Sequence, residues 1–590
     1  MNNQVFTVLS IEDHKTVDFS GNVRENYFRE AKQLYANTIS VTFRWNFFEK
    51  EMGRYDTTIL RNIKMIAEKY NLKVIILWFG SNISGHENCV PNYIRNDSIM
   101  YIPYTRSDKS FATKISDMGG DRIYCYSLDE KHPNDLLLRE RKALQALMTW
   151  IKINDSEETF IMMQLGGELF VHPELWRPWP PVYLSSARLF DGQNVYRWDT
   201  IFPVRACSLK IESHIKMTKN QQLEFCLISP TGRKYWSTTI KSNGKLDIHI
   251  GGKFINQRCQ LMIQRKESNF DTIEVSKIMI KPIAERCHCQ RCNEIFFTHR
   301  FDSDKHFQQS VFVNYIKALA SAVAEVDQSF PLFLNILVSH DAKTLLGNPY
   351  YRPKDYLHLV PDIDFLGPDI YYESKVSVID SFYQGQNTIF IPEAGKFKYL
   401  KDSDYLNAFS LIFPILSAYR GIGIQIYDLQ SSKFGLLSTK WQWEENAYLV
   451  RNSFCAIRQL PLEIFNKKSK IIGFRNITKE IFFLEDIKIE IESISASEYA
   501  RGIISKMGDS LILCGIGFKA AIDRSHFSAG NIKIERGYWE DNKYISLGAL
   551  NPTTYKIGET IEIEMDADDF SSPDTFDPLN KQYCVLLTPF

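Results

Sequence analysis

Two glutamates, Glu168 and Glu393, each close a short apolar stretch of this 590-residue chain. Glu168 follows the run 160–163 (Phe-Ile-Met-Met) through Gln-Leu-Gly-Gly, and Glu393 ends the run 388–393 (Thr-Ile-Phe-Ile-Pro-Glu). The strand ends of an α/β barrel carry its catalytic groups, so a strand that stops at a carboxylate is a candidate position for an acid. Hydrolysis of a glycoside uses two such groups, and a separation of about 5–5.5 Å makes one of them a nucleophile and gives retention. We therefore predict that Glu168 and Glu393 face each other across one pocket as a glycosidase pair.

The elements that would position these glutamates alternate between strand-like and helix-like stretches, the pattern of an α/β fold. Apolar runs predict strands at residues 5–9, 38–43, 74–78, 160–165, 332–337, 364–371, 388–391 and 421–427. Amphipathic stretches predict helices at residues 23–34, 58–70, 136–153, 307–327 and 405–419. About eight strand–helix units are what a (β/α)8 TIM barrel requires. Glu168 and Glu393 would then sit at the carboxyl ends of strands four and seven.

Two further segments are expected to be all-β, because short alternating runs replace the helical period in both. Residues 176–283, broken by Pro-Thr-Gly, Ser-Asn-Gly and Gly-Gly turns, predict a β-sandwich-like module inserted after strand four. Barrels tolerate long insertions in such loops, and this one would bind sugar, shape the pocket rim or be purely structural. Residues 465–590 predict a C-terminal β-sandwich domain. The catalytic barrel would be discontinuous, comprising residues 1–175 and 284–464.

Composition narrows the class of protein. Lys and Arg number 70 and so do Asp and Glu, which argues against a nucleic-acid partner because such a protein needs a basic surface. No run of about eighteen apolar residues is present, so no membrane partner is expected. The first residues have no basic region, apolar core or cleavage site, and the 11 cysteines show no disulfide-like spacing. These features predict a cytoplasmic protein without a nucleic-acid or membrane partner, and they leave homo-oligomer formation open. The carbohydrate substrate is implied by the predicted glycosidase pair.

Several stretches resemble clan A glycoside hydrolases. In residues 37–56 a strand-like run reaches Trp45 and continues into the pattern E-x-x-x-G-x-[YF]-D, which resembles the second-strand signature of the clan. Residues 72–80 look like its third strand, residues 370–372 (Ile-Tyr-Tyr) fit strand six, and residues 391–394 (Ile-Pro-Glu-Ala) fit the nucleophile strand.

The resemblance is closest to the β-galactosidase-like families 35 and 42. Residues 508–518 and 534–537 look like the β domain that follows the barrel in bacterial family 35-like proteins. The resemblance implies a retaining exo-β-glycosidase that removes terminal sugars by a two-glutamate double displacement. Glu168 would be the acid/base and Glu393 the nucleophile.

Gly167 departs from the clan pattern, in which an Asn that binds the sugar 2-hydroxyl precedes the acid/base. Either the substrate lacks this contact, or another side chain supplies it, or catalysis is weakened. A glycine also leaves room for a bulkier C2 substituent, so a β-glycosidase for a C2-modified sugar is one alternative. A non-catalytic carbohydrate-binding protein on a glycosidase barrel is another.

Three cysteines, Cys287, Cys289 and Cys292, form the pattern C-x-C-x-x-C where the inserted module is expected to end. Thiolates this close suit a structural zinc, which takes four ligands in a tetrahedron. Family 42 enzymes carry a similar arrangement with one upstream cysteine, which implies Cys125 as the fourth ligand. His288 in place of Cys125, or reduced thiols without metal, are the alternatives. The chemistry itself requires no cofactor.

Aromatic residues near the predicted strand ends are candidates for stacking on a sugar: Trp45, Trp78, Tyr371 and Trp176. Aromatic faces suit the C–H-rich side of a pyranose, although each of these residues could equally pack at the top of the barrel. Together with Gly167 they form the predicted substrate-binding set.

Overall fold

The computed structural model covers the 590-residue chain. It describes residues 7–80, 89–95, 101–103, 122–124, 136–166, 182–189, 194–204, 209–218, 221–250, 257–266, 271–282, 297–298, 300, 304–336, 353–383, 387–395, 406–431, 435–465, 469–495, 499–523, 532–540, 543–550 and 560–589.

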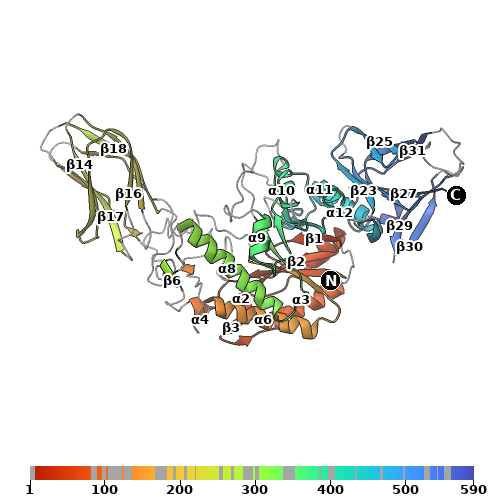
Figure 1. Ribbon diagram of the computed structural model, residues 1–590, viewed down its shortest axis with the longest axis horizontal. Coiled ribbons are helices and arrows are strands. Elements are labelled where there is room, and N and C mark those ends of the chain that lie inside the picture. Colours follow the sequence, from red (N-terminus) through yellow and green to blue (C-terminus); the bar gives the residue numbers. More distant parts are fainter. Residues whose placement is uncertain are drawn as a thin grey trace.

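An eight-stranded parallel sheet forms the centre of the molecule (Figure 1). Its strands run in the order β20-β19-β8-β5-β2-β1-β22-β21. A parallel bridge between Ile370 and Ala394 and the hydrogen bond from Ile370 N to Glu393 O (2.9 Å) join the first and last strands. The strands are β1 (Val8–Glu12), β2 (Thr38–Arg44), β5 (Lys73–Phe79), β8 (Phe160–Leu165), β19 (Leu332–Ile336), β20 (Phe365–Pro368), β21 (Phe390–Ala394) and β22 (Gly423–Tyr427).

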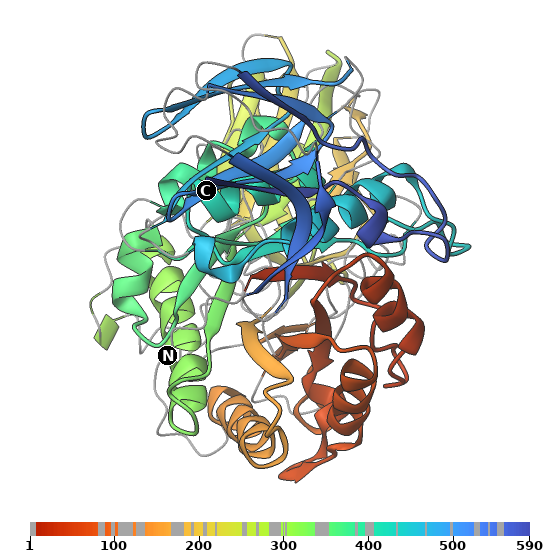
Figure 2. The same cartoon turned by 90° about the vertical axis from the view of Figure 1, so that its right-hand side faces the viewer.

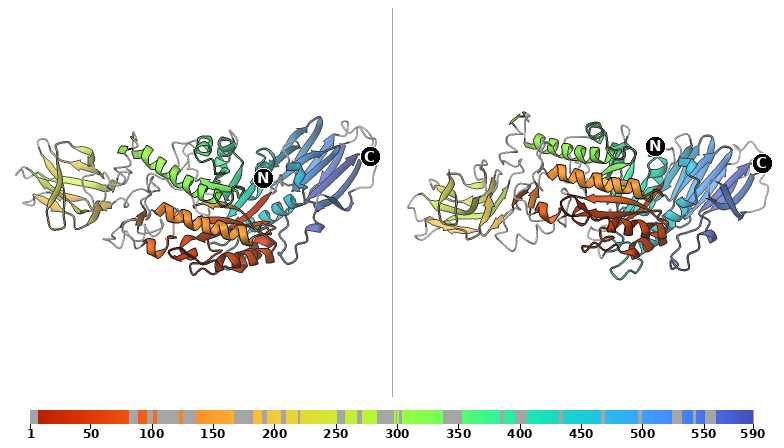
Figure 3. Two further views of the ribbon diagram at one scale, coloured as in Figure 1. Left: turned by 60° about the horizontal axis from the view of Figure 1, so that its bottom comes forward. Right: turned by 90° about the horizontal axis from the view of Figure 1, so that it is seen from below.

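Helices cover the outside of this sheet, and the amphipathic ones bury a stripe of apolar side chains. In α3 the buried residues Ile59, Leu60, Ile63, Ile66 and Ala67 recur with the helical period. Figure 3 shows α6 and α8 lying side by side along the barrel. The helices are α1 (Glu25–Gln33), α3 (Thr58–Lys69), α6 (Leu136–Asn154), α8 (Asp304–Ala324), α9 (Pro353–Leu359), α10 (Val378–Tyr383), α11 (Ala408–Ser417) and α12 (Glu445–Arg458).

Short elements lie in the connections between the longer ones. They are α2 (Trp45–Phe48), β3 (Glu49–Glu51), β4 (Arg54–Tyr55), α4 (Asn92–Arg95), β6 (Tyr101–Pro103), β7 (Arg122–Tyr124) and the 3-10 turns Glu373–Lys375, Leu462–Phe465 and Pro578–Asn580. The β3–β4 pair is the hairpin that the glycine of the E-x-x-x-G pattern allows, since Gly53 has φ +73°.

Ten strands between residues 182 and 282 form two antiparallel sheets beyond one end of the barrel (left in Figure 1). Their orders are β10-β18-β13-β16 with β9 on β18, and β11-β17-β14-β15 with β12 on β17. Inward residues such as Leu209, Ile211, Phe225 and Leu261 form a separate apolar core. The strands are β9 (Val182–Leu184), β10 (Ala187–Leu189), β11 (Val195–Arg197), β12 (Phe202–Val204), β13 (Leu209–Lys216), β14 (Leu223–Ile228), β15 (Lys234–Ile240), β16 (Gly244–Ile250), β17 (Gln257–Arg265) and β18 (Ile273–Pro282).

The C-terminal strands form a six-stranded and a four-stranded antiparallel sheet at the other end (Figures 1 and 2). The orders are β23-β26-β27-β32-β29-β30 and β24-β25-β28-β31. Ile503, Ile512 and Trp539 join the core of the barrel, so the larger sheet packs directly on it. The strands are β23 (Lys470–Arg475), β24 (Lys479–Leu484), β25 (Ile487–Ser493), β26 (Arg501–Met507), β27 (Ser510–Ile516), β28 (Phe518–Asp523), β29 (Ile532–Glu540), β30 (Lys543–Ala549), β31 (Thr560–Glu564) and β32 (Cys584–Pro589).

The predicted fold class, a (β/α)8 barrel with additional β domains, is confirmed by this strand order. The exact domain boundaries stay a prediction. Two strand predictions miss by a few residues in a way that matters for the site: the first strand is Val8–Glu12, not 5–9, and the seventh is Phe390–Ala394, not 388–391. Within the residues that the structure describes, no helix is long and apolar enough to cross a membrane.

Candidate active site

Glu393 lies near the carboxyl end of β21, and its side chain is buried (4% exposed). All five residues of this strand are buried, as expected for a parallel strand that is covered on both faces. Asn335 Nδ2, on β19, donates to Glu393 Oε1 at 2.8 Å, and the hydroxyl of Tyr371, just after β20, donates to Oε2. Donors from two neighbouring strands therefore orient one carboxylate, and both contacts favour its ionised form.

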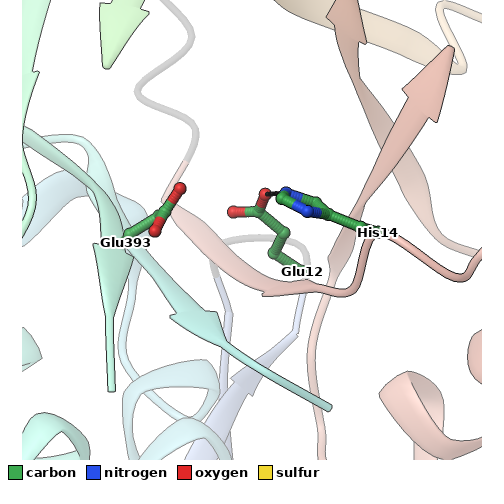
Figure 4. A group of neighbouring side chains, drawn as sticks. All are labelled: Glu12, His14 and Glu393. Atoms are coloured by element: carbon green, nitrogen blue, oxygen red, sulfur yellow. Dashed lines mark hydrogen bonds and ion pairs between the residues drawn. The ribbon is translucent and has the colours of Figure 1, made fainter. Parts of the chain in front are cut away.

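Glu12, at the carboxyl end of β1, is the second buried carboxylate of the site (1% exposed). Its Oε1 lies 3.0 Å from His14 Nε2, and its Oε2 accepts a hydrogen bond from the amide of Gln425 on β22. Figure 4 shows Glu393 opposite the Glu12–His14 pair. One ligand atom of each of Glu12, His14 and Glu393 lies within 4.8 Å of the others.

His14 carries the electrostatic consequence of this arrangement. Burial acts to lower the pKa of His14, but the hydrogen bond to Glu12 and the charges of Glu12 and Asp13 outweigh it, and the net shift is upward. Arg44 opposes the upward shift. An imidazole that is flanked by carboxylates in this way favours its protonated, positively charged form.

Two further ionisable groups, the half-buried Tyr427 and the buried Asp428, follow directly at the end of β22. Burial and the charges of Asp428, Glu393, Glu12 and Asp13 raise the pKa of Tyr427 far above its usual range, so its phenol stays neutral. Burial, together with a hydrogen bond to Asp13 and the charge of that residue, raises the pKa of Asp428. Lys15 Nζ lies 3.8 Å from both Asp13 and Asp428 and offsets part of their charge.

The arrangement around Glu393 suits a nucleophile. A carboxylate oxygen of Glu12 lies within 4.8 Å of one of Glu393, and the carboxyl groups of a retaining glycosidase pair are about 5–5.5 Å apart. However, both oxygens of Glu12 face nitrogen donors, so Glu12 is poorly suited to deliver a proton.

Glu12, His14 and Glu393 are also the one group in the described part of the chain with the residue types and spacing to hold a cation. The hydrogen bonds of Glu12 to His14 and Gln425, and those of Glu393 to Asn335 and Tyr371, instead favour a network of hydrogen-bonded side chains.

Trp45 and Trp78 are not at the pocket, which corrects their assignment as sugar-stacking residues. Both are 0% exposed. The indole of Trp45 donates to Glu49 Oε2 at 2.7 Å, and that of Trp78 donates to Glu140 Oε1 at 3.0 Å. A ring with no exposed face cannot stack on a sugar, so both belong to the barrel core.

The E-x-x-x-G pattern after the second strand now has a local explanation. Besides the indole of Trp45, the Glu49 carboxylate accepts the backbone N–H of Gly53 at 2.7 Å. The glutamate thus ties the end of β2 to the β3–β4 hairpin, which is a structural role.

Tyr371 does lie in the site, although its hydroxyl contacts Glu393. The other predicted residues fall outside the described residues: Gly167, Glu168, Trp176, Cys125, Cys287, Cys289 and Cys292. Up to that point the chain is held at the strand ends, because Gly166 N donates to Trp78 O at 3.0 Å and Gln164 Nε2 donates to Gly166 O at 3.0 Å.

The sequence prediction missed Glu12, His14, Asn335 and Gln425. A signal for the first two was present in Ile11-Glu12-Asp13-His14, directly after the first apolar run. Ending that strand at residue 9 placed these side chains in a loop instead of at the rim. Asn335 and Gln425 lie inside apolar strands. No local sequence pattern shows that a single polar residue in such a strand faces the barrel interior.

Comparison with known proteins gives distant structural matches. No family model matches the chain, and no curated protein matches its sequence. Endo-glycoceramidase II from Rhodococcus sp. is 10% identical with a TM-score of 0.38, over 99% of this chain and 97% of that one. A β-galactosidase from the haloarchaeon Halorubrum lacusprofundi is 8% identical with a TM-score of 0.40, over 78% of this chain and 58% of that one.

An exo-β-1,4-mannosidase from Opitutaceae bacterium strain TAV5 is 9% identical with a TM-score of 0.34, over 76% of this chain and 59% of that one. The chain therefore spans less than two thirds of the mannosidase and β-galactosidase chains. These neighbours are glycoside hydrolases, as are the clan A enzymes that the sequence resembles. Because the TM-scores are all below 0.5, the fold assignment rests on the strand order and the proposed chemistry on the site.

Proposed function

We propose that this protein is a retaining β-glycosidase in which Glu393 is the nucleophile and Glu168 the acid/base. The observation that carries the proposal is the environment of Glu393, a buried carboxylate at a barrel strand end that accepts hydrogen bonds from Asn335 and Tyr371. Two donors on one carboxylate hold it in a single orientation, which nucleophilic attack requires.

In the first step Glu393 attacks the anomeric carbon while Glu168 gives its proton to the leaving oxygen, and the glycosidic bond breaks. In the second step Glu168 takes a proton from water, the water oxygen attacks the anomeric carbon, and the bond to Glu393 breaks. Tyr371 and Asn335 would orient Glu393 in both steps. The role of Glu168 rests on its place after β8 in the sequence and on the unsuitability of Glu12 as a proton donor.

The substrate part of the proposal is a terminal β-galactoside-like sugar, removed in the exo mode. It rests on the sequence resemblance to families 35 and 42. Gly167 makes a C2-modified sugar the nearest alternative, and a panel of aryl glycosides that includes 2-acetamido sugars separates the two. Activity that is confined to the 2-acetamido compounds would favour the alternative.

The decisive test is Glu393→Gly. Turnover of the best aryl β-glycoside in the panel should be abolished, and azide should restore it by entering the space left by the carboxylate and yielding an α-glycosyl azide. Glu492→Gly, on the C-terminal β25 and far from the site in sequence, is the matched control and should keep parental turnover. Unimpaired activity of Glu393→Gly would contradict the assignment.

A non-catalytic carbohydrate-binding protein is the second candidate, and the glycine at position 167 favours it. Calorimetric binding of a sugar without hydrolysis of any panel member would support this candidate over the enzyme.

A further inference from the structure

We propose that His14 is a positioning residue whose positive charge lets Glu12 and Glu393 be ionised side by side and so holds the nucleophile in its reactive form. This inference rests on the proposed function, because it assigns a task to the group next to the proposed nucleophile.

The geometry sets the requirement. Glu12 and Glu393 are 1% and 4% exposed, so water screens their repulsion weakly, and their oxygens approach within 4.8 Å. Two like charges at that distance cannot both persist in a buried site without compensation, as carboxylate pairs in other proteins show. His14 lies within the same 4.8 Å of both and forms the 3.0 Å contact with Glu12.

The remaining ionisable neighbours act elsewhere. Lys15 Nζ lies 3.8 Å from a carboxylate oxygen of Asp13 and 3.8 Å from one of Asp428. Arg44, at the end of β2, donates to the backbone oxygens of Val17 (2.8 Å) and His14 (3.2 Å), and its charge opposes protonation of the imidazole.

Two aromatic neighbours add no compensating charge. The phenol of Tyr427 is neutral, and Tyr371 is a hydrogen-bond donor to Glu393. His14 lies within 4.8 Å of both carboxylates and so is placed to compensate the charge of each.

The imidazole is also held in place. Its ring packs edge-on against Phe79, with centroids 5.3 Å apart, and tilted against Tyr427 at 5.5 Å. Its side chain is 36% exposed, so one face borders solvent while Nε2 points at Glu12. A ring restrained on two sides keeps its charge at a more constant distance from Glu393 than a flexible lysine would, so a lysine at this position should restore the charge but only part of the geometry.

The sign of the pH effect follows from the shift of the His14 pKa. Native His14 binds its proton more tightly than the unfolded chain does, because the hydrogen bond to Glu12 and the charges of Glu12 and Asp13 outweigh burial. Protonated His14 therefore stabilises the folded state. This stabilisation is complete at pH values below the pKa of histidine in the unfolded chain, about 6.5, and it is lost as pH rises through the higher pKa of His14 in the folded protein. When His14 is replaced by the neutral Asn, Glu393 should ionise only at a higher pH than it does in the parent protein.

The first experiment needs no turnover. The 12 histidines are titrated by NMR, and the His14 signal is identified by its absence from His14→Gln. Neutralising a carboxylate in Glu393→Gln or Glu12→Gln should lower the His14 midpoint by about one pH unit or more. Glu492→Gln is the control and should leave it unchanged. An unmoved midpoint in Glu393→Gln, with the other histidine signals unperturbed, would overturn the inference.

The second experiment measures kcat/KM against pH for the parent, His14→Asn and His14→Lys. The acidic limb should move upward by about one to two pH units in His14→Asn and return toward the parent in His14→Lys. An equal loss of activity at every pH in His14→Asn would mean a merely structural role. A parent without glycosidase activity would end the proposed function, while the NMR titration would still decide the charge coupling.

Discussion

Glu393 receives its two described hydrogen bonds from side chains that the chain order separates, Asn335 on β19 and Tyr371 after β20. A sequence motif does not show which side chains donate to a given carboxylate. The Ile-Pro-Glu-Ala stretch identifies the carboxylate, but its reactivity depends on which donors reach its two oxygens. A donor lost from a buried charge costs more than one lost from a neutral group, because the charge keeps its desolvation penalty.

Tyr371→Phe tests that dependence. Removal of one hydrogen bond to a charged group costs about 1.5–3 kcal/mol, which corresponds to a loss of about 10- to 160-fold in kcat/KM. Steady-state kinetics on the best aryl glycoside measures it. The matched control is Tyr419→Phe, whose hydroxyl donates to the exposed side chain of Asp380 at 2.8 Å, and it should change kcat/KM little. Equal kinetics for Tyr371→Phe and the parent would mean that this donor does not orient the nucleophile.

At the scale of elements, helix α12 is the joint between the barrel and the C-terminal sheets. Arg501, at the start of β26, is fully buried, and its guanidinium donates two hydrogen bonds of 2.6 and 2.9 Å to the carboxylate of Asp568. The same guanidinium donates to Ser453 Oγ (2.8 Å) and Leu449 O (3.3 Å) on α12. One side chain therefore ties a helix of the barrel to the β domain.

Arg501→Met should destabilise the protein by about 3–5 kcal/mol, because it leaves the buried Asp568 carboxylate without its charged partner and, among the described residues, only the amide of Asn452 still donates to it. Urea denaturation followed by fluorescence measures the change. Lys519→Met is the control: Lys519 pairs with Glu564 at 3.1 Å, but both side chains are about 60% exposed (59% and 61%), so little change is expected. Comparable loss in the two variants would contradict the assigned joint.

At the scale of the whole molecule, a barrel stands between two β units that attach to it differently (Figure 1). The C-terminal sheet shares the core of the barrel, whereas the sheets between residues 182 and 282 have a core of their own. The predicted zinc would lie where that insertion rejoins the barrel and would pin the loops after strands three and four together. Its four cysteines are outside the described residues, so the zinc stays a prediction.

Metal analysis of protein purified without added zinc tests it. We expect about one zinc per chain, since a site of four thiolates is closed and structural. Cys289→Ser should lower the zinc content and the thermal midpoint. Cys226→Ser removes a buried thiol of the inserted sheets and should keep the metal. Absence of metal in the parent protein would end the prediction.

The sequence by itself determined the barrel, the additional β units and the position of Glu393, because hydrophobic periodicity and strand-end residues are local properties of the chain. It placed Trp45 and Trp78 wrongly, since an aromatic residue at a strand end can face either the pocket or the core, and only the packing around it selects one. The approach of Glu12 and His14 to Glu393 is a product of ring closure. Ring closure places β22 between β1 and β21, which lie almost the full length of the barrel sequence apart. No local pattern predicts a contact that depends on the register of eight strands.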